Sequence, residues 1–78
     1  MRKSLTKNIA DVRSMINTTE LKLIDKHCDP AFLVTQAKLE IMSLERMDIP
    51  QYTRVQTLLK VAALIVLALD KTNEPAKG

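Results

Sequence analysis

His27 and Cys28 are the one adjacent pair of side chains whose types could bind a metal or act in catalysis. A tetrahedral zinc site needs four ligands, and the chain of 78 residues has no second cysteine or histidine. Cysteine–histidine catalysis fares worse, since adjacent residues on a helix point about 100° apart. We expect both residues to end a helix, with His27 near free carbonyls and Cys28 packed as a small apolar residue. A zinc site shared between copies is the alternative.

Paired carboxylates give no better candidate for chemistry. Glu40 and Glu45 do not share a helix face, and Asp25 and Asp29 flank a predicted helix boundary, where basic neighbours favour ordinary solvated ion pairs. The single glycine, Gly78, excludes a glycine-rich phosphate loop. The sequence therefore predicts no catalytic residue, no metal ligand and no cofactor, and we expect a protein that is not an enzyme.

The beginning of the chain is basic. Its candidate phosphate contacts are Arg2, Lys3, Lys7 and Arg13. Such a segment could act as an arm that touches nucleic acid, so the alternative function is a phage- or plasmid-type DNA-binding regulator. A solvated helix start explains the same residues, and the formal net charge of the whole chain is only +3. Phe32 and Tyr52 are the only aromatic residues, which leaves little for base stacking.

The first predicted element is a helix over residues 5–26, which carries Lys7 and Arg13 of the basic segment. Its apolar positions recur at spacings of three and four, which is typical of a helical seam. They are Leu5, Ile9, Val12, Ile16 and Leu23. Asn17, Thr18 and Thr19 interrupt this helix with side chains that compete for backbone hydrogen bonds. We therefore predict a kink or a restart at these three residues.

Two further helices follow. Asp29 is a natural N-cap and Pro30 suits the first helical position, so a helix is predicted over residues 30–47. The break before Pro50 starts another over residues 50–70. Residues 71–78 hold no periodicity and are predicted to be a disordered tail. Short connections favour antiparallel neighbours, so residues 1–70 form one all-α domain: a three-helix antiparallel bundle or an extended helical hairpin, completed by self-association or a partner.

Residues 61–69 are nine consecutive apolar residues. A helix that is apolar all round must be covered on every side. We expect its core face to be the broad one formed by Val55, Leu58, Leu59, Ala62, Ile65, Val66 and Leu69. Leu64 and Leu67 project from the other side, on either flank of Lys60, and these three residues are the predicted partner-binding site. The alternative is that this helix is central and both leucines belong to the core.

The cellular compartment is predicted from the length of the longest apolar stretch and from the number of cysteines. The strongest apolar stretch, Leu58–Leu69, has 12 residues and contains Lys60, whereas a membrane-spanning helix needs about 20. A single thiol, Cys28, favours a reducing compartment. The sequence thus predicts a soluble cytoplasmic protein without a membrane partner.

Asp48-Ile49-Pro50-Gln51-Tyr52, followed by Leu58-Leu59 and the apolar run, resembles the second helix of the small chaperones that hold type III secretion needle subunits. The resemblance covers residues 48–69 and implies a helical hairpin that acts without catalysis. Together with the apolar run, it favours a small protein-interaction module, namely an adaptor, an inhibitor or a chaperone. Its expected partners are another protein, a second copy in a homodimer, or both; nucleic acid is the less favoured partner.

Overall fold

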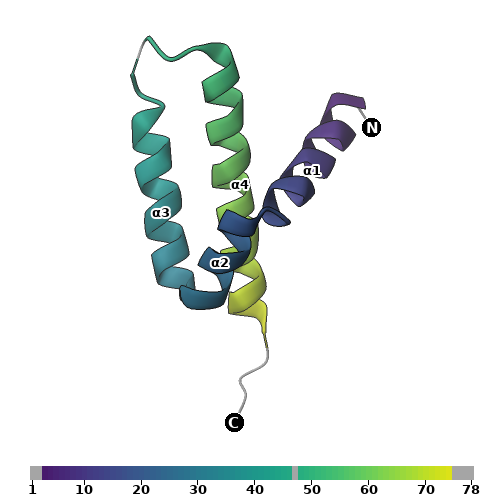
Figure 1. Cartoon of the computed structure of the whole chain (residues 1–78), viewed down its shortest axis with the longest axis vertical. Helices are drawn as coiled ribbons and strands as arrows, with labels where there is room; N and C mark the ends of the chain where they lie inside the picture. The colour runs from purple at the N-terminus through teal and green to yellow at the C-terminus, as the bar shows by residue number, and fades with distance from the viewer. Residues whose placement is uncertain (1–2, 47, 75–78) are drawn as a thin grey trace.

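The computed structural model describes residues 3–46 and 48–74, which form four α-helices and no strand (Figure 1). The helices are α1 (Lys3–Ile16), α2 (Thr19–His27), α3 (Pro30–Ser43) and α4 (Gln51–Asn73). The predicted all-α class is confirmed. Four helices replace the expected three because the first predicted helix is divided in two.

The division between α1 and α2 lies at the predicted position. Thr18 has extended backbone angles and is the N-cap of α2. Its hydroxyl donates a hydrogen bond to the Met15 carbonyl over 2.7 Å and accepts one from the Leu21 N–H over 3.4 Å. A side chain that satisfies the end of one helix and the start of the next favours a corner over a continuous helix. The chain therefore turns here, and α1 leans away from the other helices toward its N-terminal end (Figure 1).

The connection from α2 to α3 is as short as predicted. Cys28 ends α2 with extended backbone angles, and its N–H donates to the Ile24 carbonyl over 2.9 Å. Asp29 is the N-cap of α3 and accepts the Phe32 N–H at Oδ1 over 2.8 Å, while Pro30 takes the first helical position. Both predicted helix-start residues are confirmed.

The end of α3 comes earlier than residue 47, where it was predicted. The Ser43 hydroxyl donates to the Glu40 carbonyl over 2.6 Å, and the Leu44 N–H bonds the Ile41 carbonyl over 2.9 Å. Hydrogen bonds over three residues tighten the last turn and close the helix. Met47, the last residue of the predicted helix, lies outside the described residues.

The last helix is longer than predicted, since α4 continues to Asn73. Lys71 in its final turn lies 3.5 Å from Asp25 of α2, measured from Nζ to Oδ1, and the Thr72 hydroxyl donates to the Ala68 carbonyl over 2.8 Å. These contacts hold the last turn in place. The predicted disordered tail is therefore wrong for residues 71–73, and its residues 75–78 lie outside the described part of the chain.

The helices pack around α4. Helices α3 and α4 run antiparallel side by side, α2 lies across one end of this pair, and α1 packs on α4 near its middle (Figure 1). Among the described residues the buried core consists of Leu21, Leu33, Ala37, Val61, Ala63, Leu64, Leu67 and Ala68. Three of these are alanines, so the core is small and most of its volume comes from α4.

Candidate protein-binding surface

Leu64 and Leu67 lie in the core. Leu64 is 0% exposed and Leu67 is 7% exposed, and both belong to one cluster with Leu21 of α2 and Leu33 of α3. The prediction that these two leucines face a partner is therefore wrong. The alternative, in which their helix is central and both are core residues, is confirmed. They are sealed because α2 and α3 both cover this side of α4.

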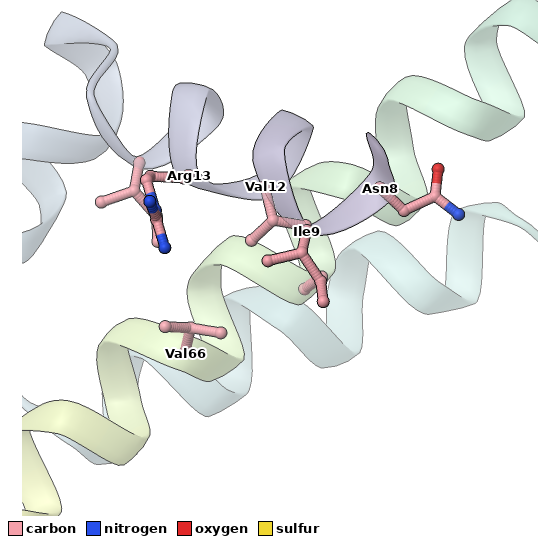
Figure 2. A pocket seen from close by; sticks show the side chains of 7 residues that line it. Asn8, Ile9, Val12, Arg13 and Val66 are labelled. Atoms are coloured by element: carbon pink, nitrogen blue, oxygen red, sulfur yellow. The ribbon is translucent and has the colours of Figure 1, made fainter. Parts of the chain in front are cut away.

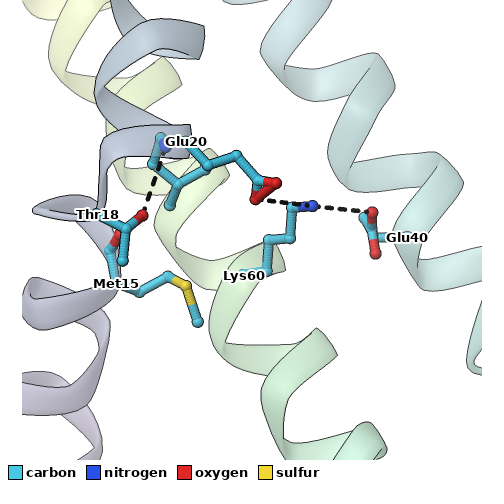
Figure 3. Close-up of polar contacts among 6 residues, drawn as sticks. Met15, Thr18, Glu20, Glu40 and Lys60 are labelled. Carbon is cyan, nitrogen blue, oxygen red and sulfur yellow. Dashed lines mark hydrogen bonds and ion pairs between the residues drawn. The ribbon is translucent and has the colours of Figure 1, made fainter.

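Lys60 is a charged residue on the covered side of α4, and its position there is explained by two carboxylate partners. Its ammonium group lies 3.4 Å from Oε1 of Glu20 on α2 and 3.5 Å from Oε1 of Glu40 on α3 (Figure 3). A lysine side chain can lay its methylene stem along apolar neighbours while the charged end reaches the edge. The two carboxylates meet that end, so Lys60 is held within the chain. We therefore correct its assignment to a partner-binding site.

The opposite side of α4, predicted to be the core, is only partly covered: Leu59 and Ala62 are half-buried beneath α1, and the other five predicted core residues are exposed. Its exposed fractions are 44% for Val55, 50% for Leu58, 44% for Ile65, 44% for Val66 and 58% for Leu69. The faces are reversed because a helix that is apolar all round gives periodicity no basis for choosing one. Ala63 and Ala68 favour the observed choice, since small side chains let neighbouring helices approach α4 closely.

The same side of the molecule includes part of α3. Around α3, the buried Leu33 and Ala37 lie between Glu40 on one flank and Val34 and Ile41 on the other. Val34 is 51% exposed and Ile41 is 46% exposed. The flank that carries Glu40 faces Lys60, so Val34 and Ile41 lie on the side of α3 away from that ion pair.

An equivalent order holds around α4. Buried Val61, Leu64 and Ala68 separate Lys60 from Leu58 and Ile65. The exposed pairs of the two helices consequently lie on one side of the α3–α4 interface. We call this surface the open face and define it by Val34, Ile41, Leu58, Ile65 and Leu69.

The ion pair also sets the register of the open face. Glu40 and Lys60 lie level in the antiparallel pair. Ile41 comes one residue after Glu40 and Leu58 two residues before Lys60, so these two side chains are nearly level. Val34 and Ile65 are likewise nearly level, about two helical turns further along. Val34, Ile41, Leu58 and Ile65 thus form the four corners of a rectangle of aliphatic side chains on the open face.

A groove adjoins the open face where α1 crosses α4. Its cavity has a volume of about 350 Å³ and is lined by Asn8, Ile9, Val12, Arg13, Ile16, Ala62 and Val66. Figure 2 shows Ile9 and Val12 projecting from α1 above Val66 of α4. Ile9 is 50% exposed, and Ala62 lies between Val66 and Leu58 around α4. Exposed apolar surface therefore continues from α3 across α4 to α1.

The basic start of the chain is spread along α1. Lys7 is paired with Asp11, with 2.8 Å between Nζ and Oδ2, and Arg13 is exposed at the edge of the groove. Arg2 and the side chain of Lys3 lie outside the described residues. The Lys7–Asp11 pair lowers the local positive charge that a phosphate would meet. A phosphate-binding role for the four basic residues stays a prediction.

His27 and Cys28 occupy the positions predicted for them. His27 is the last residue of α2 and is exposed, and Cys28 is half-buried against the core. Within residues 3–46 and 48–74, no group of three or more histidine, cysteine, aspartate or glutamate side chains is arranged to hold a metal ion.

By length and composition alone, α4 is also able to cross a membrane. The 12-residue apolar stretch lies within a helix of 23 residues, longer than the sequence indicated. A single such helix is weak evidence, because a mostly buried core helix of a soluble protein passes the same test; in α4, 28% of the apolar window is buried. Lys60, with its two carboxylate partners, lies in the N-terminal half of this helix.

Comparisons with models of known protein families, with curated proteins and with solved structures find no match to this chain. The resemblance of residues 48–69 to the chaperones of secretion needle subunits stays a prediction. What the chain can do is inferred from its own surface.

Proposed function

We propose that this protein is a non-enzymatic interaction module that binds another protein chain through the open face. The supporting observation is the reversal of α4, which covers Lys60, Leu64 and Leu67 and exposes Leu58 and Ile65. Contiguous exposed apolar surface on a small protein marks an interaction site more often than isolated apolar residues do. An adaptor, an inhibitor or a chaperone would each use such a surface, as the predicted resemblance to needle-subunit chaperones also suggests.

The energetics favour a partner that is itself apolar. Completing the burial of a half-exposed valine, leucine or isoleucine contributes about 1 kcal/mol, since full burial is worth about 1.5–3 kcal/mol. The five residues of the open face therefore supply about 5 kcal/mol from this side. Association costs on the order of 4–15 kcal/mol, so the partner must bring a comparable apolar surface. A mainly polar partner would not offset this cost.

We also propose that the protein works in the cytoplasm and in the aqueous phase. The single thiol, Cys28, suits a reducing compartment. One side of α4 packs against α2 and α3 and buries Leu64 and Leu67, so this side is not available to lipid. The ion pairs of Lys60 with Glu20 and Glu40 tie α4 to these helices.

A photo-crosslinking residue placed on the open face tests this function. One variant carries the reactive side chain at Leu58, and a control carries it at Leu39 of α3, which is equally exposed at 54% but lies on the outer side of α3, away from α4. In living cells of the source organism, we expect the Leu58 variant to form a discrete crosslinked protein species and the Leu39 variant to form none. Absence of any crosslink at Leu58, or equal crosslinking at both positions, would contradict the proposal.

A further inference from the structure

We infer that the occupant of the open face is a second copy of this chain, so that two α3–α4 pairs pack face to face as a four-helix arrangement. This inference rests on the proposed function and names the partner. It goes beyond the general interaction module because it requires the surface to be complementary to itself. Three features of the described residues support that requirement.

The first feature is the rectangle of aliphatic side chains. Val34 and Ile65 lie at one level of the open face, and Ile41 and Leu58 lie at the other, about two helical turns away. A dimer with two-fold symmetry uses the same patch on both subunits. A two-fold axis that lies in the plane of this face and runs along the helices places Val34 on Ile65 of the second copy. An axis that runs across the helices places Val34 on Ile41 of the second copy. Aliphatic side chains therefore meet aliphatic side chains in both arrangements.

The second feature is the distribution of charge. In a symmetric interface, a charge near the axis meets its own copy, and such like-charge contacts cost several kcal/mol. Among residues 55–69 of α4, the only charged residue is Lys60, and it points to the opposite side, between Glu20 and Glu40. Lys38 of α3 is exposed at the outer edge of that helix. The centre of the face carries no charge, while Arg54, one turn before Leu58 on the same side of α4, borders it together with Lys38.

The third feature is the amount of surface. The chain exposes 6155 Å², whereas a compact protein of 8.8 kDa is expected to expose about 4,800 Å². Part of the difference comes from α1, which leans away from the helical pair (Figure 1). The excess of about 1,350 Å² is larger than the roughly 800 Å² that each subunit buries in an interface of standard size. The chain therefore exposes enough surface to form an interface of that size with a second copy.

Sedimentation equilibrium of the full chain tests this inference. The wild type is compared with Leu58→Glu/Ile65→Glu on the open face and with the control Leu23→Glu/Leu39→Glu, which changes two leucines elsewhere that are somewhat more exposed. We expect the wild type and the control to sediment with twice the mass of 8.8 kDa and to dissociate on dilution. We expect the open-face variant to stay monomeric, with its helical circular dichroism retained.

A second variant guards against misfolding. Val34→Glu alters the open face from α3 and leaves α4 unchanged, so it should also give a helical monomer. A wild type that is monomeric at every concentration overturns the inference, as does a dimer that survives both open-face changes.

The mass of the photo-crosslinked species distinguishes failure of the dimer inference from failure of the proposed function. A crosslink at Leu58 of twice the chain's mass supports the second copy, whereas a crosslink to a different protein overturns it and leaves the proposed function standing. Co-flotation of the wild type with phosphatidylcholine–phosphatidylglycerol vesicles, lost in the open-face variant, would assign the surface to lipid and overturn both.

Discussion

Lys60 and Leu58 are two residues apart in α4 and lie on opposite sides of it. The ammonium group of Lys60 lies 3.5 Å from Glu40, while the side chain of Leu58 is half exposed. A charged residue therefore marks the covered side of the helix, and an aliphatic residue marks the open side. This relationship fixes which side chains hold the fold and which are left for a partner.

The covered side of α4 should contribute most of the free energy of unfolding. Leu64→Ala removes a side chain that is 0% exposed, and such changes cost about 2–5 kcal/mol. A single small core rarely supplies more than about 3–5 kcal/mol, so we expect this variant to be largely unfolded. Urea unfolding followed by circular dichroism measures the loss.

Leu58→Ala is the matched control for that measurement. The same chemical change at a half-exposed position leaves the monomer's free energy of unfolding within about 1 kcal/mol of the wild type. The comparison is made at the lowest workable concentration, where association contributes least. Equal destabilisation by the two variants would show that both sides of α4 are buried.

The ion pairs of Lys60 should contribute little to stability. Glu20 has a side-chain exposure of 63%, and Lys60 and Glu40 each keep 28%, so neither pair is fully buried and each should contribute about 1 kcal/mol or less. Lys60→Met keeps a similar apolar stem, so we expect unfolding within about 1 kcal/mol of the wild type and a smaller effect of salt. A loss as large as that of Leu64→Ala would mean that these charges, and not the apolar core, hold α2 and α3 in place.

The corner at Thr18 should limit how firmly α1 is held. Leu5 and Ile9 near the start of α1 are 41% and 50% exposed, so this helix buries little surface. Local stability follows buried contacts, and we expect amide hydrogens of α1 to exchange faster than those of α3 and α4. Thr18→Ala should speed that exchange further and cost about 1 kcal/mol, because an N-cap is lost. Uniform exchange across all four helices would contradict this view.

Association should appear in thermal unfolding as well. Binding to the folded chain alone raises the melting temperature as concentration rises. We expect the melting temperature of the wild type to increase with protein concentration and that of Leu58→Glu/Ile65→Glu to stay constant. A flat response in the wild type would describe a self-sufficient monomer.

The sequence was a good guide to where the helices start. Asp29 and Pro30 start a helix through local hydrogen bonding and a fixed backbone angle, and Thr18 falls within the predicted break. These effects act within a few residues, so they can be predicted without the tertiary structure. The end of α4 was missed because Asp25, from another helix, helps to hold Lys71.

The candidate surface could not be predicted in the same way. In residues 61–69 every position is apolar, so the pattern carries no information on which side is covered. Lys60 was interpreted as part of a partner-binding site, whereas its own partners Glu20 and Glu40 come from segments 40 and 20 residues earlier. The available signal was the combination of these acids with the small residues Ala63 and Ala68, which favours close helix packing on the lysine side.

The most direct measurement compares thiol reactivity on the two sides of α4. Leu58→Cys and Leu64→Cys are each made in a Cys28→Ser chain and treated with a soluble maleimide, at low protein concentration and again in denaturant. We expect the thiol at Leu58→Cys to react within a few-fold of its rate in denaturant, and the thiol at Leu64→Cys to react only as fast as the chain unfolds. Faster native reaction at Leu64→Cys than at Leu58→Cys would contradict the inward orientation of Lys60, Leu64 and Leu67.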